Sequence, residues 1–287
     1  MRKGLNHINV LLGLEIIILL IITITGIQSF EIEKSFFVTN IYGQTIQLFG
    51  NGAYFYDSYF KAPIFIGTDF TILVLVLPAL IGTLIWVNIK PSLKNKLVLV
   101  SLLGVIFYYS ISISTGITYN YLFLFYISSV ILSWISVFML IKDLDLNQLV
   151  LKTPIKGYAI FLIITGIALF AIWLMDIIPT FLNGSSLSLI ETYTTEVTYV
   201  YDMAFISPIM FLSYYLIKKN DGFGTVLLAC MLVLCTVMGV MLPIQSAFQF
   251  VANIDIPIPV LIIKVGVFVL LACFSSVLSY QLFKSIE

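Results

Sequence analysis

Several charged and amide side chains stand inside, or at the ends of, long apolar runs of this sequence. A charge placed in hydrocarbon costs at least ~2.5–3.5 kcal/mol on insertion scales, so an ionisable residue in such a run marks a site for a ligand, an ion or a proton. Carboxylates at such positions suit a small cation or a polar amine. The candidate binding residues are Asp69, Asn120, Asp176, Asp202, Gln245 and Lys264.

Asp202 and Lys264 lie deepest in this set. Counted from the outer ends of their spans at 1.5 Å per helical residue, the two lie at similar depths in the membrane. An ion pair reduces the free-energy cost of embedding either charge. We therefore predict that the two side chains meet, near Asp69. Two interpretations remain open: a pair that only holds two helices together, or ligands of a polar cavity that opens outward.

Signatures of common enzymes and metal sites are missing from the chain. It contains no H-E-x-x-H, G-x-S-x-G, C-x-x-C or Walker A lysine. The single histidine, His7, cannot form a His-rich metal site. The sequence therefore predicts no metal and no cofactor, identifies no catalytic residue, and leaves open whether the protein is an enzyme.

The elements that position these residues are membrane-spanning helices. Of the 287 residues, 61% are hydrophobic and 10% are charged, and the mean hydropathy is +1.11. Soluble domains carry about 25% charged residues, so the composition indicates an integral membrane protein in the lipid bilayer. The zero net charge gives no indication of nucleic-acid binding. We expect an all-α bundle of eight transmembrane helices at 8–27, 70–89, 97–117, 121–141, 157–178, 198–217, 223–247 and 258–283.

The basic residues set the expected orientation in the cell membrane. With both termini in the cytoplasm, 11 of the 14 basic residues fall in cytoplasmic segments, as the positive-inside rule requires. The reverse orientation would place most lysines outside. The cytoplasmic set is Arg2, Lys3, Lys90, Lys94, Lys96, Lys142, Lys152, Lys156, Lys218, Lys219 and Lys284.

The segment 28–69, between the first two spans, is the longest connection and is expected outside the cell. Residues 36–39 and 45–49 have the composition of short strands, and Gly43 is turn material. A small β-hairpin over the outer face is one interpretation. An irregular loop whose aromatic side chains rest at the headgroup level is the other.

Spans two and six share a pattern that suggests an internal repeat. Each runs from an aspartate through a proline to basic residues, with Asp69 and Pro78 in one and Asp202 and Pro208 in the other. Two halves of four spans with the same orientation would follow, as in some transporters. The positive-inside rule alone would also produce acidic outer ends and basic inner ends.

Several phrases of the chain resemble a family of uncharacterised bacterial multi-pass membrane proteins with about eight spans. The resemblance supports the topology and the choice of Asp69, Asn120 and Asp202. It implies no activity, substrate or cofactor. The phrases are FGNGAYFYDS (49–58), APIFIGTD (62–69), YY (108–109), YNYLFLFY (119–126) and YVYDMAFISP (199–208).

Three functions fit these observations. The first is a transporter or channel-like protein with an outward-facing acidic cavity, which the intramembrane charges and the repeat favour. The second is a membrane-embedded enzyme acting on a lipid-linked or extracellular substrate. The third is a sensor or assembly partner that uses its outer loop. The sequence specifies neither the substrate nor the oligomeric state.

Overall fold

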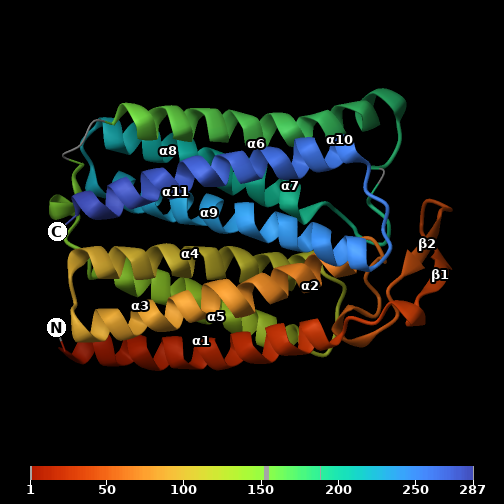
Figure 1. The fold of residues 1–287 in the computed structure, drawn as a ribbon, viewed down its shortest axis with the longest axis horizontal. Coiled ribbons are helices and arrows are strands. Elements are labelled where there is room, and N and C mark those ends of the chain that lie inside the picture. Colours follow the sequence, from red (N-terminus) through yellow and green to blue (C-terminus); the bar gives the residue numbers. More distant parts are fainter. Residues whose placement is uncertain (1, 152–154, 188, 287) are drawn as a thin grey trace.

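A computed structural model describes residues 2–151, 155–187 and 189–286 of the chain. Within these residues, eight helical segments are long and apolar enough to cross a membrane, and a two-stranded sheet lies between the first and the second (Figure 1). The chain is therefore an all-α multi-pass membrane protein, which confirms the predicted fold class. The spans are α1 (Arg2–Gln28), α2 (Ala62–Thr71) with α3 (Leu77–Ile89), α4 (Leu93–Gly116), α5 (Phe123–Lys142), α6 (Lys156–Asn183), α7 (Val197–Tyr201) with α8 (Ser207–Lys218), α9 (Gly222–Val251), and α10 (Ile258–Val260) with α11 (Val267–Ser285).

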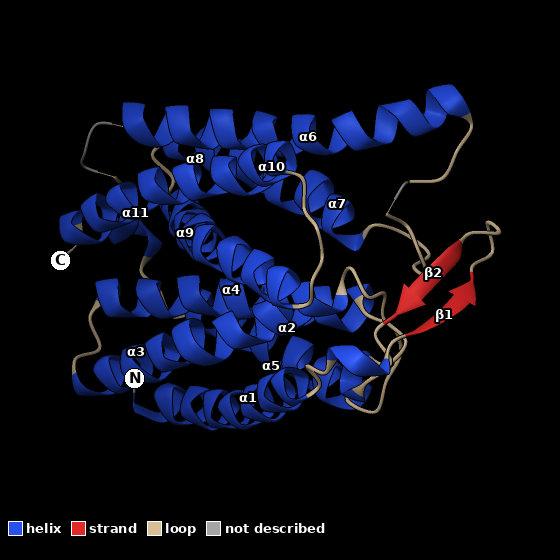
Figure 2. Ribbon diagram, turned by 45° about the vertical axis from the view of Figure 1, so that its right-hand side comes forward, coloured by secondary structure: helices blue, strands red, loops and turns tan. Residues whose placement is uncertain are grey.

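The spans form two halves that lie side by side. Helices α1 to α5 make one group and α6 to α11 the other in both ribbon views (Figures 1 and 2). In each half, consecutive spans contact one another and the fourth also contacts the first, as short connections between antiparallel helices favour. Helix α9 packs on both α2 and α4, and so joins the halves. The spans thus group four and four by their contacts, and the internal repeat itself stays a prediction.

Three of the spans contain a stretch of π-helix. This form is rare in proteins, and where it occurs it is often at a functional site. In spans two and six it ends two residues before Pro78 and Pro208, respectively. A proline removes one backbone donor and crowds the preceding turn, so the wider turn is a local response to it. The π-helical stretches are Ile72–Val76 (η3), Asp202–Ile206 (η5) and Leu261–Gly266 (η6).

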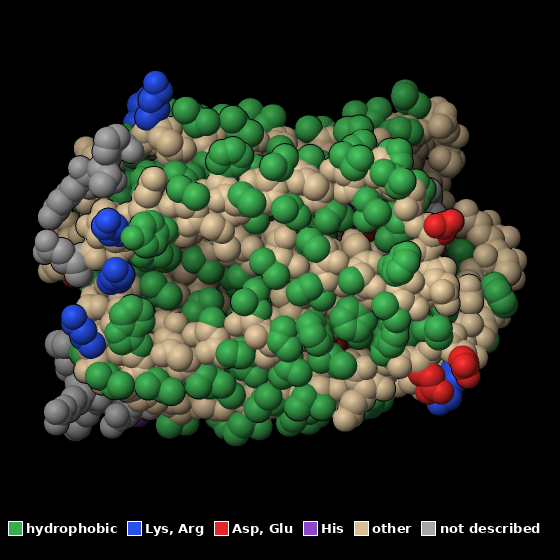
Figure 3. Space-filling model, viewed as in Figure 1, with side chains coloured by type: hydrophobic (Ala, Val, Ile, Leu, Met, Phe, Trp, Pro, Cys, Tyr) green, Lys and Arg blue, Asp and Glu red, His purple; other side chains and the backbone are tan. Residues whose placement is uncertain are grey.

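The two ends of the bundle differ in charge. Both termini lie at one end, here named the terminal end, and the sheet projects from the other, the loop end (Figure 1). On the face shown in Figure 3, lysine and arginine gather at the terminal end and carboxylates at the loop end. The surface between them is apolar, with Ile85, Phe138 and Leu270 each more than half exposed. Lipid chains are the natural solvent for such a band.

The second span begins earlier than the sequence pattern predicted. Helix α2 starts at Ala62 instead of residue 70, so the connection from α1 is shorter than the predicted 28–69. Pro63 in its first turn suits a helix start, because the N–H that proline lacks has no helical partner there. Asp69, expected at the mouth of the span, lies inside the helix with no exposed surface.

The connection between α1 and α2 contains the hairpin. Strands β1 (Phe36–Thr39) and β2 (Thr45–Leu48) pair antiparallel, with Phe36 opposite Leu48 (Figure 2). Gly43 takes a positive φ of 77° in the turn, which glycine adopts without strain. The segment after the hairpin packs onto the bundle, since Phe49 and Tyr54 are buried. Short 3-10 turns lie at Ile32–Lys34 (η1), Gly52–Tyr54 (η2) and Leu146–Leu149 (η4).

Candidate functional site

A cavity of about 320 Å³ lies between the two halves, toward the loop end. Its walls come from α2, α4, α6, α7, α9 and the last span, together with the segment that leads into α7. Most of the lining side chains are apolar or aromatic and a few are polar, which is the usual character of a small-molecule site. Besides the aromatic residues, the polar side chains of the lining are Lys61, Thr68, Ser112, Thr195, Glu196, Thr198, Asp202, Gln245, Ser246, Gln249 and Lys264.

Asp202 is the carboxylate of this cavity. It begins the π-helical stretch η5 and is 6% exposed. The Tyr108 hydroxyl donates to its Oδ1 at 3.0 Å, and the Trp173 indole N–H donates to its Oδ2 at 2.9 Å. Both donors are neutral, and no lysine or arginine among the described residues lies within ion-pair distance of it. Asp202 is thus hydrogen-bonded but without a counter-charge.

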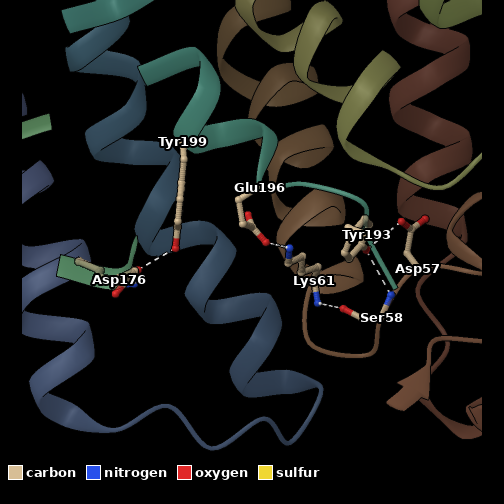
Figure 4. Close-up of polar contacts among 8 residues, drawn as sticks. Asp57, Ser58, Lys61, Asp176, Tyr193, Glu196 and Tyr199 are labelled. Carbon is tan, nitrogen blue, oxygen red and sulfur yellow. Dashed lines mark hydrogen bonds and ion pairs between the residues drawn. The ribbon is translucent and has the colours of Figure 1, made fainter. Parts of the chain in front are cut away.

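The predicted pair between Asp202 and Lys264 is wrong. Lys264 Nζ instead contacts Asp176 Oδ2 at 2.6 Å. The Tyr199 hydroxyl donates to the same carboxylate at 2.7 Å (Figure 4). Lys264 Nζ also lies 5.7 Å from the centroid of the Trp173 ring. Depth along two helices does not determine which faces meet, and the π-helical stretches η5 and η6 shift the faces of both spans.

A second ion pair joins the two halves at the wall of the cavity. Lys61, just before α2, contacts Glu196, just before α7, and both side chains line the cavity (Figure 4). Lys61 Nζ also lies 4.2 Å from the centroid of the Tyr193 ring. Both partners are largely buried, so the contact is protected from solvent screening. Lys61 and Glu196 both fall in predicted connections, and this pair could not be predicted because no sequence pattern brings the two connections together.

Tyr193 also belongs to a hydrogen-bonded cluster with Asp57 and Thr118, which joins three connections between spans at the loop end. Its hydroxyl donates to Asp57 at 2.9 Å (Figure 4). The Thr118 backbone N–H and hydroxyl donate to the same carboxylate at 2.9 and 3.0 Å. Asp57 has no exposed surface. Burial raises the pKa of Asp57 to about 6, although these hydrogen bonds and the charge of Lys61 lower it.

Asp69 lies outside the cavity lining, in a closed cluster of its own. The hydroxyls of Tyr54 and Tyr109 donate to its two carboxylate oxygens at 2.5 and 2.6 Å. Gly26 of α1 lies against it so closely that an added Cβ would stand 1.7 Å from Asp69 Oδ2. These contacts make Asp69 a junction between α1, α2 and α4, and the neighbouring residue Thr68 faces the cavity in its place.

The two predicted amide residues separate in the structure. Gln245 lines the cavity and donates to the Thr68 hydroxyl at 2.7 Å, which ties α9 to α2. Asn120 is not part of the lining. It donates to the Ala53 carbonyl at 2.9 Å and accepts from the Leu122 N–H at 2.8 Å, so it fixes the connection before α5.

Glu15 forms another buried polar group, nearer the terminal end. Ser129 donates to its Oε1 at 2.6 Å, and Ser129 also contacts the Ser110 hydroxyl at 2.7 Å. Glu15 Oε2 has no hydrogen-bond partner among the described residues. The hydrogen-bonded series described from Glu15 ends at Ser110, one residue from Tyr109, and does not join the cluster around Asp69.

Comparison of the chain with protein-family models, with curated proteins and with solved structures found no match. The resemblance to uncharacterised bacterial membrane proteins therefore stays a prediction.

Proposed function

We propose that this protein is a transporter-like membrane protein, which takes a small molecule into the cavity between its halves from the loop end. The proposal rests on the position of the cavity, which lies at the interface between the two four-span groups. An ion pair between Lys61 and Glu196 joins these groups beside it. Many transporters bind their substrate at the interface between repeats and move one repeat against the other.

The orientation that goes with this proposal places the loop end outside the cell and both termini in the cytoplasm. The distribution of lysine supports it. Single cysteines at Asn51 and Ser186, in a chain whose own cysteines are replaced, should react with an impermeant thiol reagent added to intact cells. Protection of both positions would contradict the orientation.

Accessibility of the cavity from the two sides tests transport. Ser112 and Ser246 both line the cavity, so a cysteine at either position reports on it. A transporter exposes the cavity to each side in turn, so reagent should reach these cysteines both in intact cells and in inside-out vesicles. Labelling from the loop end alone would instead indicate a receptor or an enzyme.

Matched positions keep that experiment interpretable. Ser185 is exposed near the loop end and Lys219 near the terminal end, so cysteines there should react from one side only. Ser133 is fully buried within α5, and a cysteine there should react from neither side. A cavity cysteine that behaves like the one at Ser133 would contradict the proposal.

A second candidate function, binding of another protein, is favoured by the hairpin. Phe37, Ile41 and Tyr42 are each at least half exposed at its turn and first strand, which project beyond the bundle (Figure 2). Exposed aromatic and aliphatic side chains in a cluster are typical of interaction surfaces. Serine at all three positions should remove a chemically cross-linked complex in native membranes, with the cavity cysteines still reactive. An unchanged cross-linking pattern would count against this function.

A further inference from the structure

The charges around the cavity do not balance. Lys61 faces Glu196 and Lys264 faces Asp176, so each lysine already has a carboxylate partner. Among the described residues, Asp202 has only the neutral donors Tyr108 and Trp173. An anion entering the cavity would have to compete for a lysine that is already paired, whereas a cation would find a carboxylate with no counter-charge.

The surroundings of Asp202 suit an organic cation better than a metal ion. Trp173 stacks on Tyr199 with ring centroids 4.4 Å apart, and Tyr108 and Tyr201 are in edge contact at 6.3 Å. Aromatic faces attract ammonium groups through their π-systems. The ammonium of Lys264 lies 5.7 Å from the centroid of the Trp173 ring, within the range of such contacts. A metal ion needs several oxygen ligands, but the Trp173 N–H can only donate.

The rest of the lining is apolar and constrains the body of the ligand. Side chains such as Leu234, Met238, Met241 and Phe268 form the wall contributed by α9 and α11. Such a wall binds hydrocarbon and excludes a heavily hydrated ion. Methionine also fills irregular space and adapts to different shapes.

We propose that the cavity binds an organic monocation, an amine or quaternary ammonium with an apolar body, and that the Asp202 carboxylate receives its charged group between Tyr108 and Trp173. This inference rests on the proposed function, since it names the class of molecule that the transporter would carry. The Lys264–Asp176 pair keeps the lysine away from Asp202 and leaves that carboxylate free for the ligand.

Trp173 provides the measurement. The chain has three tryptophans, and the other two, Trp86 and Trp134, are about half exposed and lie outside the cavity lining. Replacing both with Phe leaves the emission of Trp173 as a reporter of the cavity. The purified protein is titrated with phenethylamine, 2-phenylethanol and 3-phenylpropionate, which share an aromatic body and differ in charge. We expect a saturable change with the amine, and a weaker one with the alcohol and the acid.

Two substitutions separate a cation site from an anion site. Asp202→Asn keeps the shape and should weaken phenethylamine binding at least about tenfold, the order expected when a charged hydrogen-bond partner is lost. Lys264→Met should tighten phenethylamine binding, because it removes a positive charge from the cavity lining. Asp255→Asn removes an exposed carboxylate near the loop end outside the lining and serves as the matched control. Size-exclusion profiles and melting temperatures establish that each variant is folded.

The other outcomes contradict either the organic-cation assignment or the proposed function. Equal binding of all three probes, loss of amine binding in Lys264→Met, or displacement of the amine by Na⁺ or K⁺ at constant ionic strength would overturn the organic-cation assignment. No response to the amine, in a protein whose Ser246→Cys variant is labelled from both sides, overturns the assignment and leaves the proposed function standing. No labelling from either side overturns the proposed function itself.

Discussion

Tyr108 and Tyr109 are neighbours in α4, yet their hydroxyls donate to different buried carboxylates, Asp202 in one half of the molecule and Asp69 in the other. Consecutive helical residues point about 100° apart, so one helix between two halves presents a donor to each. Helix α4 thereby donates to the carboxylates of both span two and span six, whose other donors are Tyr54 and Trp173. Both tyrosines line the cavity, but of the two carboxylates only Asp202 does.

The two tyrosines should differ in their contribution to stability. Tyr109→Phe leaves the fully buried Asp69 with one donor fewer and should lower the free energy of unfolding by ~1–3 kcal/mol. Tyr108→Phe should have a smaller effect, because Asp202 borders a cavity where water can replace the lost hydroxyl. Melting temperatures of the two variants in the same detergent test this contrast. Equal losses would show that the cavity gives Asp202 no access to water.

Hydropathy was enough to predict the eight spans, because each needs about 20 apolar residues whatever it packs against. It misplaced the start of α2, since Asp69 was taken to mark the boundary. A carboxylate ends a span only when no donor inside the protein satisfies it, and here Tyr54 and Tyr109 do so. These partners lie 15 and 40 residues away in the sequence, where no local pattern can identify them.

The sequence was enough to predict which polar residues gather at the site, but not which of them pair with one another. Four of the six predicted site residues gather at the cavity or directly beside it: Asp176, Asp202, Gln245 and Lys264. Asp69 and Asn120 instead fix the packing of neighbouring segments. Charge and depth are readable from the sequence, whereas the facing of helices depends on packing and on π-helical turns whose positions the sequence does not state. Trp173 was missed because a tryptophan in an apolar run carries no signal of its own.

A close approach of α1 to Asp69 should make Gly26 intolerant of any side chain. The Cβ of Gly26→Ala would overlap Asp69 Oδ2, so either α1 or the carboxylate must move, which should cost ~1–3 kcal/mol of stability. Gly13, in the same helix, has no atom within 4 Å of an added Cβ. Gly13→Ala should therefore be neutral or stabilising by up to ~1 kcal/mol. Thermal unfolding of both variants measures the difference, and similar melting temperatures would contradict the packing described.

Asp57 should give the stability of the loop end a defined pH dependence. Its folded-state pKa of about 6 lies above the ordinary value of 3.8, so the native state holds this proton more tightly than the unfolded state. The stabilisation is fully present below about pH 4 and is lost as the pH rises toward 6, by roughly 3 kcal/mol at most. Above that pH the contribution of Asp57 is constant.

The variant Asp57→Asn isolates this effect because its side chain does not titrate. The melting temperature of the native protein, measured from pH 4 to pH 8, should fall relative to the variant between about pH 4 and pH 6. Burial also raises the pKa of Glu191, but that group is present in both proteins and its effect cancels in the difference. Parallel curves for the two proteins would mean that Asp57 titrates in its ordinary range.

The ion pair between Lys264 and Asp176 should be recognisable by its coupling energy. Each side chain is about one-third exposed, so removal of one partner should cost an amount between the ~0.2–1 kcal/mol of surface pairs and the ~3–5 kcal/mol of buried ones. Lys264→Met leaves the Asp176 carboxylate with the Tyr199 hydroxyl as its one partner in the described part of the chain, and should lower the melting temperature. Adding Asp176→Asn should restore much of the loss, because no unpaired charge then remains.

Adding Asp202→Asn instead should restore none, since Asp202 is not the partner of the lysine. A double-mutant cycle over the three positions measures both couplings, and a larger coupling to Asp202 than to Asp176 would reverse the assignment of the pair.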